Sequence, residues 1–332
     1  MSFTAKPVHR QVIVITGATS GIGLATAYAA ARQGARVVLV ARNKAALAKV
    51  ARVIEAEGGQ ALTVVADVSE RRQLEAVSKA AIHAFGGYDT WVNNAGVGIF
   101  AKVEEIDEAD HRRVFDVNYF GLVDGSLIAA AHFRRHGGTI VNLGSILSEV
   151  SFPLQGSYSA TKAAIRSFTD ALRLELAHDR APVAVSLIKP AAIATPFAEH
   201  ARNYMDHEPK LPPPLYAPED VAAAILHAAE HGGRDYTVGG GGHLITALGA
   251  ALPKLLDWGS ARLGPAASRK PLPPQRPPAG NLFAAGRDGD VRAESPGFVL
   301  RAATPSAHPI PVALAATVAL GGLLAAFLGR KR

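Results

Sequence analysis

A glycine-rich stretch between a short apolar run and a helix-like segment is the strongest constraint on the fold. Residues 16–23 read TGATSGIG; the run VIVI at 12–15 precedes them, and a helix-like segment at 24–33 follows. The apolar run is too brief for a signal-peptide core and predicts a buried strand. Glycines between a strand and a helix let backbone N–H groups and the helix N-terminus approach a pyrophosphate. We therefore predict a dinucleotide-binding turn; a plain tight turn is the alternative.

Strand-like and helix-like segments alternate through most of the chain. The strand-like runs lie at 36–40, 62–66, 90–92, 138–143, 183–188 and 235–238, and the helix-like segments at 43–57, 70–85, 110–135 and 218–230. Strands that alternate with long helices indicate a parallel sheet covered on both faces. We predict an α/β fold: a Rossmann-type, doubly wound parallel β-sheet in three α/β/α layers.

Candidate ligand-binding residues follow two of these strands. Asp67 and Val68 come directly after the run at 62–66, and Asn94, Ala95 and Gly96 follow the run at 90–92. The carboxyl ends of parallel strands form the usual ligand edge of a doubly wound sheet. We expect these residues to line the binding cleft.

Arg42 follows the second strand and bears on the choice of dinucleotide. NAD-binding units usually place an acidic residue here for the ribose 2′-hydroxyl, whereas an Arg suits the 2′-phosphate of NADP. The acid is missing from Ala41-Arg42-Asn43. Arg42 therefore predicts NADP(H), with a solvated Arg as the alternative.

The stretch YSATK at 158–162 places a phenol and an ammonium four residues apart at the start of a helix-like segment. Tyr158 and Lys162 would share one helix face. A phenol with a pKa near ~10 is a poor acid–base catalyst at neutral pH, and a nearby cation favours the phenolate. Such a Tyr can give a proton to an alkoxide or take one from an alcohol. A surface Tyr and Lys on an ordinary helix is the alternative.

Two further polar residues are candidates for the same chemistry. Ser145 follows the strand at 138–143 and could donate a hydrogen bond to a carbonyl oxygen, or simply cap a turn. Asn118 lies in the middle of the segment 110–135, where a polar residue is mildly unfavourable. An exposed or internally bonded Asn is the alternative.

Composition excludes several other classes of site. The chain has no cysteine, which excludes disulfides, thiolate nucleophiles and Cys-based metal sites and leaves the redox compartment unmarked. The net charge of +7 arises from the tail, where residues 260–332 hold ten Lys or Arg and three acidic residues. Basic and acidic residues are equal in number before residue 260, which argues against nucleic-acid binding by the folded domain. A basic tail is instead suited to contact with anionic lipid.

The motifs TGATSGIG, NNAG at 93–96, Asn118, Ser145 and YSATK occur in one order along the chain. On these elements the chain resembles the classical short-chain dehydrogenases/reductases, from about residue 10 to residue 245. The resemblance implies a single Rossmann domain with a seven-stranded parallel sheet. That domain would carry the cofactor-binding and catalytic residues together.

The resemblance also implies roles for the matching residues. Ser145 would orient and polarise the substrate carbonyl, and Tyr158 would be the general acid–base. Lys162 would bind the nicotinamide ribose and lower the Tyr158 pKa, and the Asn118 backbone would hold a relay water. The implied catalytic residues are Asn118, Ser145, Tyr158 and Lys162; the implied cofactor-binding residues are Thr16, Gly17, Ser20, Gly21, Ile22, Gly23, Arg42, Asp67, Val68, Asn94, Ala95, Gly96, Tyr158, Lys162, Pro190 and Thr195; no metal site is expected. Ala191 follows Pro190 where the family often has glycine, which removes some backbone freedom.

The chain beyond the last predicted strand is not explained by this resemblance. Residues 244–258 carry leucines near helical spacing, which predicts core or dimer packing, with membrane contact as the alternative. Residues 259–309 are rich in Pro, Arg and Gly without a period and predict a linker. Residues 310–329 carry no charge and precede Arg330-Lys331-Arg332.

A helix over residues 310–329 would reach ~30 Å, the thickness of a bilayer core. We predict a transmembrane or membrane-associated helix; an interfacial or partner-docked helix and a soluble packed helix are the alternatives. The predicted segments are therefore an N-terminal extension at 1–9, the Rossmann domain at 10–258, the linker at 259–309, the apolar helix at 310–329 and the basic tail at 330–332.

The combined prediction is a membrane-associated, NADP(H)-dependent oxidoreductase acting on a small carbonyl or secondary alcohol, with a lipophilic substrate suggested by the anchor. We expect the catalytic domain on the cytoplasmic side, although the positive-inside tendency would keep the terminal basic residues there too. A homo-oligomer is possible, and no nucleic-acid partner is expected. The alternatives are an NADP(H)-binding sensor or scaffold without turnover, and a reductase of carrier-bound 3-oxoacyl chains.

Overall fold

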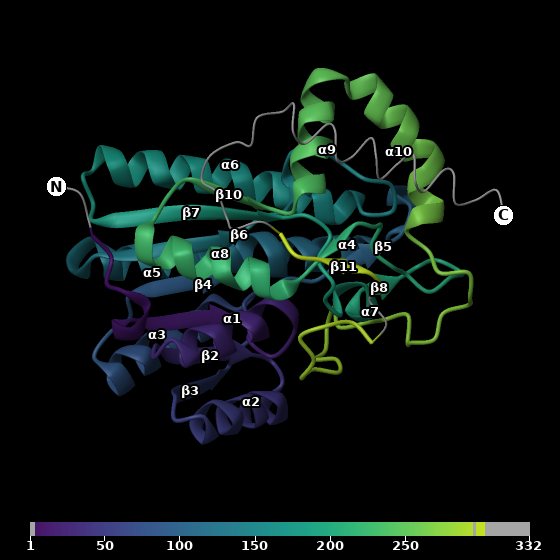
Figure 1. Ribbon diagram of the computed structural model, residues 1–332. Coiled ribbons are helices and arrows are strands. Elements are labelled where there is room, and N and C mark those ends of the chain that lie inside the picture. The colour runs from purple at the N-terminus through teal and green to yellow at the C-terminus, as the bar shows by residue number, and fades with distance from the viewer. Residues whose placement is uncertain (1–3, 295–296, 303–332) are drawn as a thin grey trace.

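Seven parallel strands form one sheet in the order β10-β7-β6-β4-β1-β2-β3 (Figure 1). The structure is a computed structural model that describes residues 4–294 and 297–302. The strands are β1 (Val12–Thr16), β2 (Arg36–Ala41), β3 (Gln60–Val65), β4 (Thr90–Asn93), β6 (Gly138–Leu143), β7 (Val183–Pro190) and β10 (Asp235–Val238). The strand order reverses between β1 and β4, and ligands bind such sheets outside the carboxyl ends of the strands at that point.

Helices cover both faces of the sheet, as predicted (Figure 1). Successive residues of β2 show why: Val37 and Leu39 pack with α1, α2 and α8 in one core cluster, whereas Val38 and Val40 pack with α3 and α5 in another. Side chains alternate across a strand, so a strand buried on both faces reads as a continuous apolar run. The helices of the two outer layers are α1 (Gly21–Arg32), α2 (Lys44–Ala56), α3 (Arg71–Phe85), α5 (Gly121–His136), α6 (Gly156–His178) and α8 (Pro218–His231).

The long helix predicted at 110–135 is interrupted. It consists of α4 (Glu108–Phe115), a π-helical turn (Asp116–Phe120) and α5, in unbroken succession. Among the described residues, this 29-residue stretch is the one long and apolar enough to cross a membrane, and half of its most apolar window is buried in the domain. Its packing in the core of the domain accounts for that composition.

The apolar segment predicted at 244–258 forms parts of two helices. These are α9 (Gly240–Ala251) and α10 (Pro253–Ala267), which meet at Leu252 and project from the body of the molecule (Figure 1). Pro253 starts the second helix because proline is tolerated in a first turn. Leu252, Leu255 and Trp258 are each more than half exposed, so this part of the stripe is not core.

The expectation of a linker at 259–309 also needs correction. Helix α10 continues to Ala267, and the described residues after it, up to 294 and from 297 to 302, lie against the domain, with Leu282 completely buried. Strand β11 (Val299–Leu300) pairs with β9 (Leu215–Tyr216), and a second small ladder joins β5 (Ile99–Phe100) to β8 (Arg202–Asn203). Single apolar residues and backbone hydrogen bonds hold this segment, and neither produces a sequence period. The apolar helix predicted at 310–329 and the basic tail at 330–332 lie outside the described residues.

The N-terminal extension predicted at 1–9 contributes to the domain where the structure describes it. A short 3₁₀ turn, Val8–Arg10, places Val8 in the core, and Lys6 pairs with Asp89 at 2.6 Å.

Candidate active site

The glycine-rich turn joins β1 to α1 at the point where the strand order reverses. Gly17 and Gly21 have φ values of +67° and +54°, which favour glycine. A Cβ on Gly23 would lie 2.1 Å from the carbonyl oxygen of Gly17, so only glycine lets the helix approach the strand this closely. The backbone N–H of Gly21 donates to the carbonyl oxygen of Asp290 at 3.0 Å, and the Ser20 hydroxyl donates to the same oxygen at 3.3 Å. Both donors therefore point to the same backbone carbonyl oxygen at this edge of the sheet.

Hydrogen bonds tie the turn to the loop after β4. The Thr16 hydroxyl oxygen accepts from the backbone N–H groups of Asn94 and Ala95, both at 3.0 Å. The Asn94 amide donates in return to the carbonyl oxygen of Thr16 at 2.8 Å. Thr195, after β7, borders the turn from the other side, since a Cβ on Gly21 would lie 3.2 Å from the Thr195 side chain. The structure thus brings the predicted residues of three loops to one edge.

The remaining predicted cofactor residues adjoin these loops. Ile22 packs against the core from the first turn of α1, and Pro190 ends β7, where it pairs with β10. Gly96 lies beside the Asn118 amide, since a Cβ there would be 3.4 Å from its oxygen. Val68 is buried against α5, where Gly121 leaves room for it.

Arg42 and Asp67 lie at the ends of β2 and β3. Their nearest charged atoms are 4.0 Å apart, and Arg113 of α4 makes a closer pair with Asp67 at 2.5 Å. Burial raises the pKa of Asp67, but hydrogen bonds from Arg113 and Ser69 outweigh it and hold the pKa below its ordinary value. Burial lowers the pKa of Arg42. Arg113 was not predicted as a site residue, because nothing in its local sequence indicates a partner 46 residues away.

Tyr158 lies on the first turn of α6, half-buried, with its ring 5.1 Å from that of Phe197. Burial raises the pKa of its hydroxyl, and a hydrogen bond with the Ser145 side chain acts in the opposite direction. The expected lowering of this pKa by Lys162 is not observed in the structure. The phenol is therefore held in its neutral form. Phe197, which follows the predicted cofactor residue Thr195 by two positions, is a further residue at the site that the sequence did not indicate.

Ser145 also serves as a cap, the alternative considered from its sequence position. Its hydroxyl oxygen accepts from the backbone N–H of Leu147 at 3.1 Å, and its own N–H donates to Ser148 at 3.2 Å. This capping box starts the 3₁₀ turn Ile146–Ser148 directly after β6. Capping fixes the position of the Ser145 hydroxyl, which acts on the pKa of Tyr158, so the structural and chemical roles are compatible.

Lys162 lies one helical turn beyond Tyr158 and is 5% exposed. Its ammonium donates to the carbonyl oxygen of Leu143 at 2.7 Å and lies 5.4 Å from the centre of the Tyr158 ring. Burial lowers its pKa to about 8. Because the charge bonds to the end of β6, it does not contact the phenol oxygen directly.

Asn118 lies in the π-helical turn between α4 and α5 and is 1% exposed. Its amide oxygen accepts from the Val97 N–H at 2.8 Å, and its amide nitrogen donates to the Val97 carbonyl at 2.9 Å and to Thr161 at 3.2 Å. The side chain thus locks the loop after β4 against α6. A π turn alters the helix ladder, and such turns occur frequently at functional sites.

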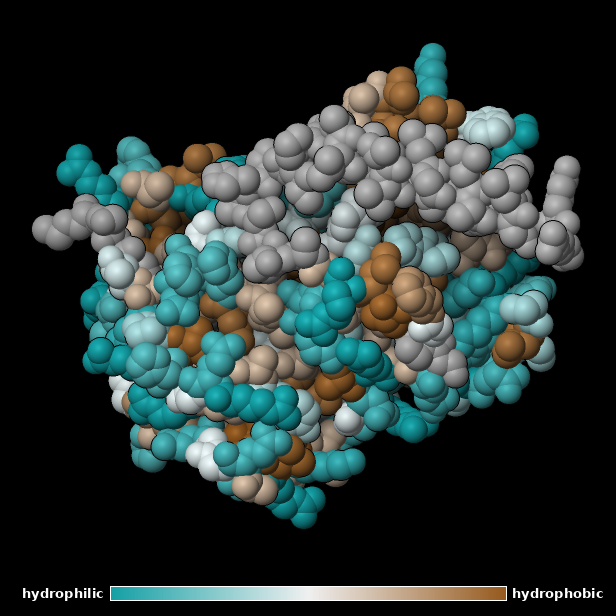
Figure 2. All heavy atoms as spheres, viewed as in Figure 1, coloured by the Kyte–Doolittle hydropathy of each residue, from teal (hydrophilic) through white to brown (hydrophobic). Residues whose placement is uncertain are grey.

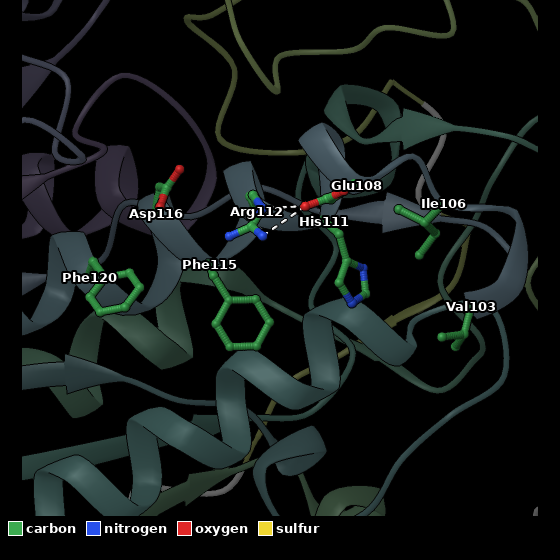
Figure 3. A pocket seen from close by; sticks show the side chains of 8 residues that line it. All are labelled: Val103, Ile106, Glu108, His111, Arg112, Phe115, Asp116 and Phe120. Carbon is green, nitrogen blue, oxygen red and sulfur yellow. Dashed lines mark hydrogen bonds and ion pairs between the residues drawn. The ribbon is translucent and has the colours of Figure 1, made fainter.

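A groove of about 610 Å³ lies along α4, apart from these residues (Figure 3). Its lining residues are Val103, Ile106, Glu108, His111, Arg112, Phe115, Asp116 and Phe120. Glu108 and Arg112 pair along α4 at 2.7 Å. None of the predicted site residues lines this groove, so we do not assign the chemistry to it.

Comparisons with known proteins agree with this geometry. Residues 11–206 match the model of the short chain dehydrogenase family. The chain is 42% identical over 255 residues to the uncharacterized oxidoreductase YxnA of Bacillus subtilis, covering 76% of this chain and 72% of that protein. It is 38% identical over 229 residues to 3beta-hydroxysteroid dehydrogenase 1 of Eggerthella lenta, covering 66% and 86% of the two chains.

A solved structure shares the fold. The alcohol dehydrogenase from the archaeon Thermococcus sibiricus, complexed with 5-hydroxy-NADP, is 28% identical with a TM-score of 0.60, covering 68% of this chain and 95% of that one. The chain belongs to the classical short-chain dehydrogenase/reductase family. It is thus an oxidoreductase that acts on CH–OH groups and binds a nicotinamide cofactor.

Proposed function

We propose that this protein uses NADP(H) to interconvert a carbonyl and a secondary alcohol on a lipophilic substrate. The observation that carries the proposal is the arrangement of Ser145, Tyr158 and Lys162: the Ser145 side chain opposes the rise in the Tyr158 pKa, and the Lys162 ammonium lies 5.4 Å from the phenol ring. The bound nicotinamide cofactor supplies or accepts the hydride. The protein must then stabilise the substrate oxygen and move one proton.

Each of the three residues has a part in that proton transfer. The Ser145 hydroxyl donates to the substrate oxygen and stabilises its developing charge. The Tyr158 hydroxyl gives its proton to the alkoxide oxygen in reduction and accepts it in oxidation. Lys162, with its pKa lowered to about 8, still holds a proton at neutral pH and favours the phenolate once the proton has left Tyr158. Asn118 positions the loop after β4 beside them.

The residues of the glycine-rich turn fit a dinucleotide. The N–H of Gly21 and the hydroxyl of Ser20 converge on one oxygen, the Asp290 carbonyl, as they would on a phosphate oxygen. Arg42 lies at the end of β2, where the chain has no acidic residue to hydrogen-bond a ribose 2′-hydroxyl. The position of Arg42 supports NADP(H) over NAD(H).

The exposed apolar residues of α9 and α10 support a lipophilic substrate. Figure 2 shows apolar side chains gathered where these two helices project from the body, and Leu252, Leu255, Trp258 and Leu263 are each more than half exposed. The Eggerthella lenta relative is named for a steroid substrate. An apolar surface on helices beside the cleft would help to recruit such a molecule.

The proposal is tested by turnover of the full-length chain. NADPH and NADH oxidation would be followed over a panel of lipophilic carbonyls, small carbonyls and carrier-linked 3-oxoacyl substrates, with Tyr158→Phe as the control. We expect oxidation that prefers NADPH and is lost in the variant. Tight NADPH binding with no Tyr158-dependent turnover would instead support the sensor reading, and activity confined to carrier-linked substrates would support the acyl reductase.

Membrane association and self-association remain part of the proposal. The anchor predicted at 310–329 would hold the enzyme at a membrane, and we propose that the catalytic domain lies on the cytoplasmic side. Homo-oligomer formation stays a prediction from the sequence.

A further inference from the structure

The segment after α10 crosses the cofactor-binding edge of the sheet. We call residues 276–294 the strap. Figure 1 shows this yellow-green part of the chain passing beside α7 (Phe197–His200) and β8. The backbone N–H of Asn281 donates to the His200 carbonyl at 2.8 Å, and the Asn203 N–H donates to the Pro278 carbonyl at 2.8 Å. Backbone hydrogen bonds therefore fix its path over the body.

One end of the strap occupies the phosphate-binding groups of the glycine-rich turn. The Asp290 carbonyl oxygen takes the donors of Gly21 and Ser20, at 3.0 and 3.3 Å. The neighbouring N–H of Gly289 donates to the Thr19 carbonyl at 2.9 Å, inside the same turn. A neutral carbonyl thus takes the place that the helix N-terminus offers to an anion.

The other end occupies the groups proposed to bind the adenosine part of NADP(H). The Arg42 guanidinium donates to the Asn281 carbonyl at 2.5 Å and to the Leu282 carbonyl at 3.4 Å. Arg113, which pairs with Asp67, also donates to the Leu282 carbonyl, at 3.1 Å. The Leu282 side chain is 0% exposed and belongs to the core cluster that contains Val68. A nucleotide and the strap would therefore compete for the same guanidinium and the same apolar site.

The hydrogen bonds that the structure describes for the strap do not involve the catalytic side chains. Within the described residues, its hydrogen bonds reach the turn after β1, the end of β2, Arg113 of α4 and the segment 194–208, and none reaches Ser145, Tyr158 or Lys162. Competition is thus expected at the level of cofactor binding.

We infer that the strap is an autoinhibitory segment, which fills the adenosine and pyrophosphate parts of the cofactor site and must leave before NADP(H) binds. The inference rests on the proposed assignment of this site to NADP(H). A protein whose binding-competent state is only partly populated binds its ligand more weakly, in proportion to that fraction. Conditions or partners that displace the strap would therefore switch the enzyme on.

Two substitutions release the strap without altering a residue assigned to the cofactor. Leu282→Ala removes its buried side chain. Gly280→Ala adds a Cβ that would lie 2.3 Å from the His200 carbonyl oxygen, at a φ of +54°. Matched controls lie nearby: Phe298 is 83% exposed, and Gly297 has a φ of +72° with nothing within 4 Å of an added Cβ. Phe298→Ala also truncates an apolar side chain, and Gly297→Ala also adds a Cβ at a positive φ, and neither change touches the strap's contacts.

The test measures NADPH affinity of the full-length chain by the change in nucleotide fluorescence on binding. We expect Leu282→Ala and Gly280→Ala to bind NADPH at least about 10-fold more tightly than the parent, since burial of one Leu corresponds to roughly 10- to 100-fold in an equilibrium. The two controls should stay within about 2-fold of the parent. Hydrogen exchange adds a readout in the parent: NADPH should speed exchange at the N–H groups of Asn281 and Gly289.

Changes in NADPH affinity and hydrogen exchange in the opposite direction would overturn the inference. A strap that closes over bound cofactor predicts weaker NADPH binding by Leu282→Ala and slower exchange at Asn281 and Gly289. Equal affinities in all five proteins, with unchanged exchange, would also contradict autoinhibition. If neither the parent nor the release variants bind NADPH or NADH, the cofactor assignment itself fails, and autoinhibition fails with it. If the release variants bind NADPH tightly but show no turnover, the proposed function is contradicted and autoinhibition is still supported.

Discussion

The ammonium of Lys162 lies 5.4 Å from the centre of the Tyr158 ring, and its hydrogen bond at 2.7 Å goes to the carbonyl oxygen of Leu143. The two side chains share a helix face, yet burial dominates the titration of both. It raises the pKa of Tyr158 and lowers that of Lys162 to about 8. The phenol therefore keeps its proton at neutral pH, and the Lys162 cation favours the phenolate once that proton has been transferred.

The first prediction concerns stability against pH. Between pH about 8 and 10 the unfolded chain keeps a proton on Lys162 that the folded chain has lost, so the free energy of unfolding rises with pH. Above pH ~10 this gain is opposed, because the phenol of Tyr158 ionises first in the unfolded chain. Lys162→Met should abolish a gain on the order of 2 kcal/mol between pH 8 and 10.

The measurement is urea unfolding at several pH values, with Lys254→Met on the exposed surface of α10 as the control. The control should show the same rise in unfolding free energy with pH as the parent. An identical rise in Lys162→Met would show that another group causes it.

The second prediction concerns cofactor choice. Arg42→Ala removes the cation proposed to bind the 2′-phosphate, and hydrogen bonds to charged groups contribute about 1.5–3 kcal/mol. The ratio of NADH to NADPH dissociation constants should therefore fall by roughly 10- to 100-fold. The ratio is the readout because Arg42 also holds the strap, whose loss would affect both nucleotides alike. Arg112→Ala, on the exposed face of α4, should leave the ratio unchanged.

The third prediction concerns the packing of the glycine-rich turn. Gly23→Ala would place a Cβ 2.1 Å from the Gly17 carbonyl oxygen, which the backbone cannot accept without moving. We expect a loss of about 1–3 kcal/mol in unfolding free energy, as overpacking usually causes, and weaker NADPH binding. Gly259→Ala, in α10 with open space around it, should be neutral or slightly stabilising. Normal stability and binding in Gly23→Ala would contradict the close approach of α1 to β1.

The fourth prediction concerns the membrane. The full-length chain should float with vesicles in a density gradient, whereas a chain ending at residue 302 should remain at the bottom. Flotation of both proteins would assign the contact to the exposed residues of α9 and α10. If neither protein floats, the anchor prediction is wrong.

The sequence was sufficient to predict the central fold. The runs at 138–143 and 235–238 match β6 and β10 residue for residue, because apolar runs bounded by loops carry a strong strand signal. The motifs also predicted that Ser145, Tyr158 and Lys162 lie together: Ser145 starts the 3₁₀ turn after β6, Tyr158 and Lys162 lie on α6, and that turn packs against α6.

Other features could not be predicted from local pattern. Arg113 reaches Asp67 across 46 residues, and Leu282 belongs to a core cluster that includes residues of β1 and β2, more than 200 residues earlier, with no period around it. The π turn at Asn118 changes the helix without changing its apolar spacing enough to detect. Long-range contacts by single residues leave no local signature.

Transfer of deuterium from NADPH labelled at the nicotinamide C4 tests the central claim most directly. Mass spectrometry would follow the label in single turnovers with a carbonyl substrate identified from the panel, in the parent and in Tyr158→Phe. The account predicts that the label reaches the carbinol carbon of the product, and that transfer in Tyr158→Phe is slower by about 10²- to 10⁴-fold. Label transfer at equal rates in both proteins, or none in a parent that binds both NADPH and the carbonyl, would contradict it.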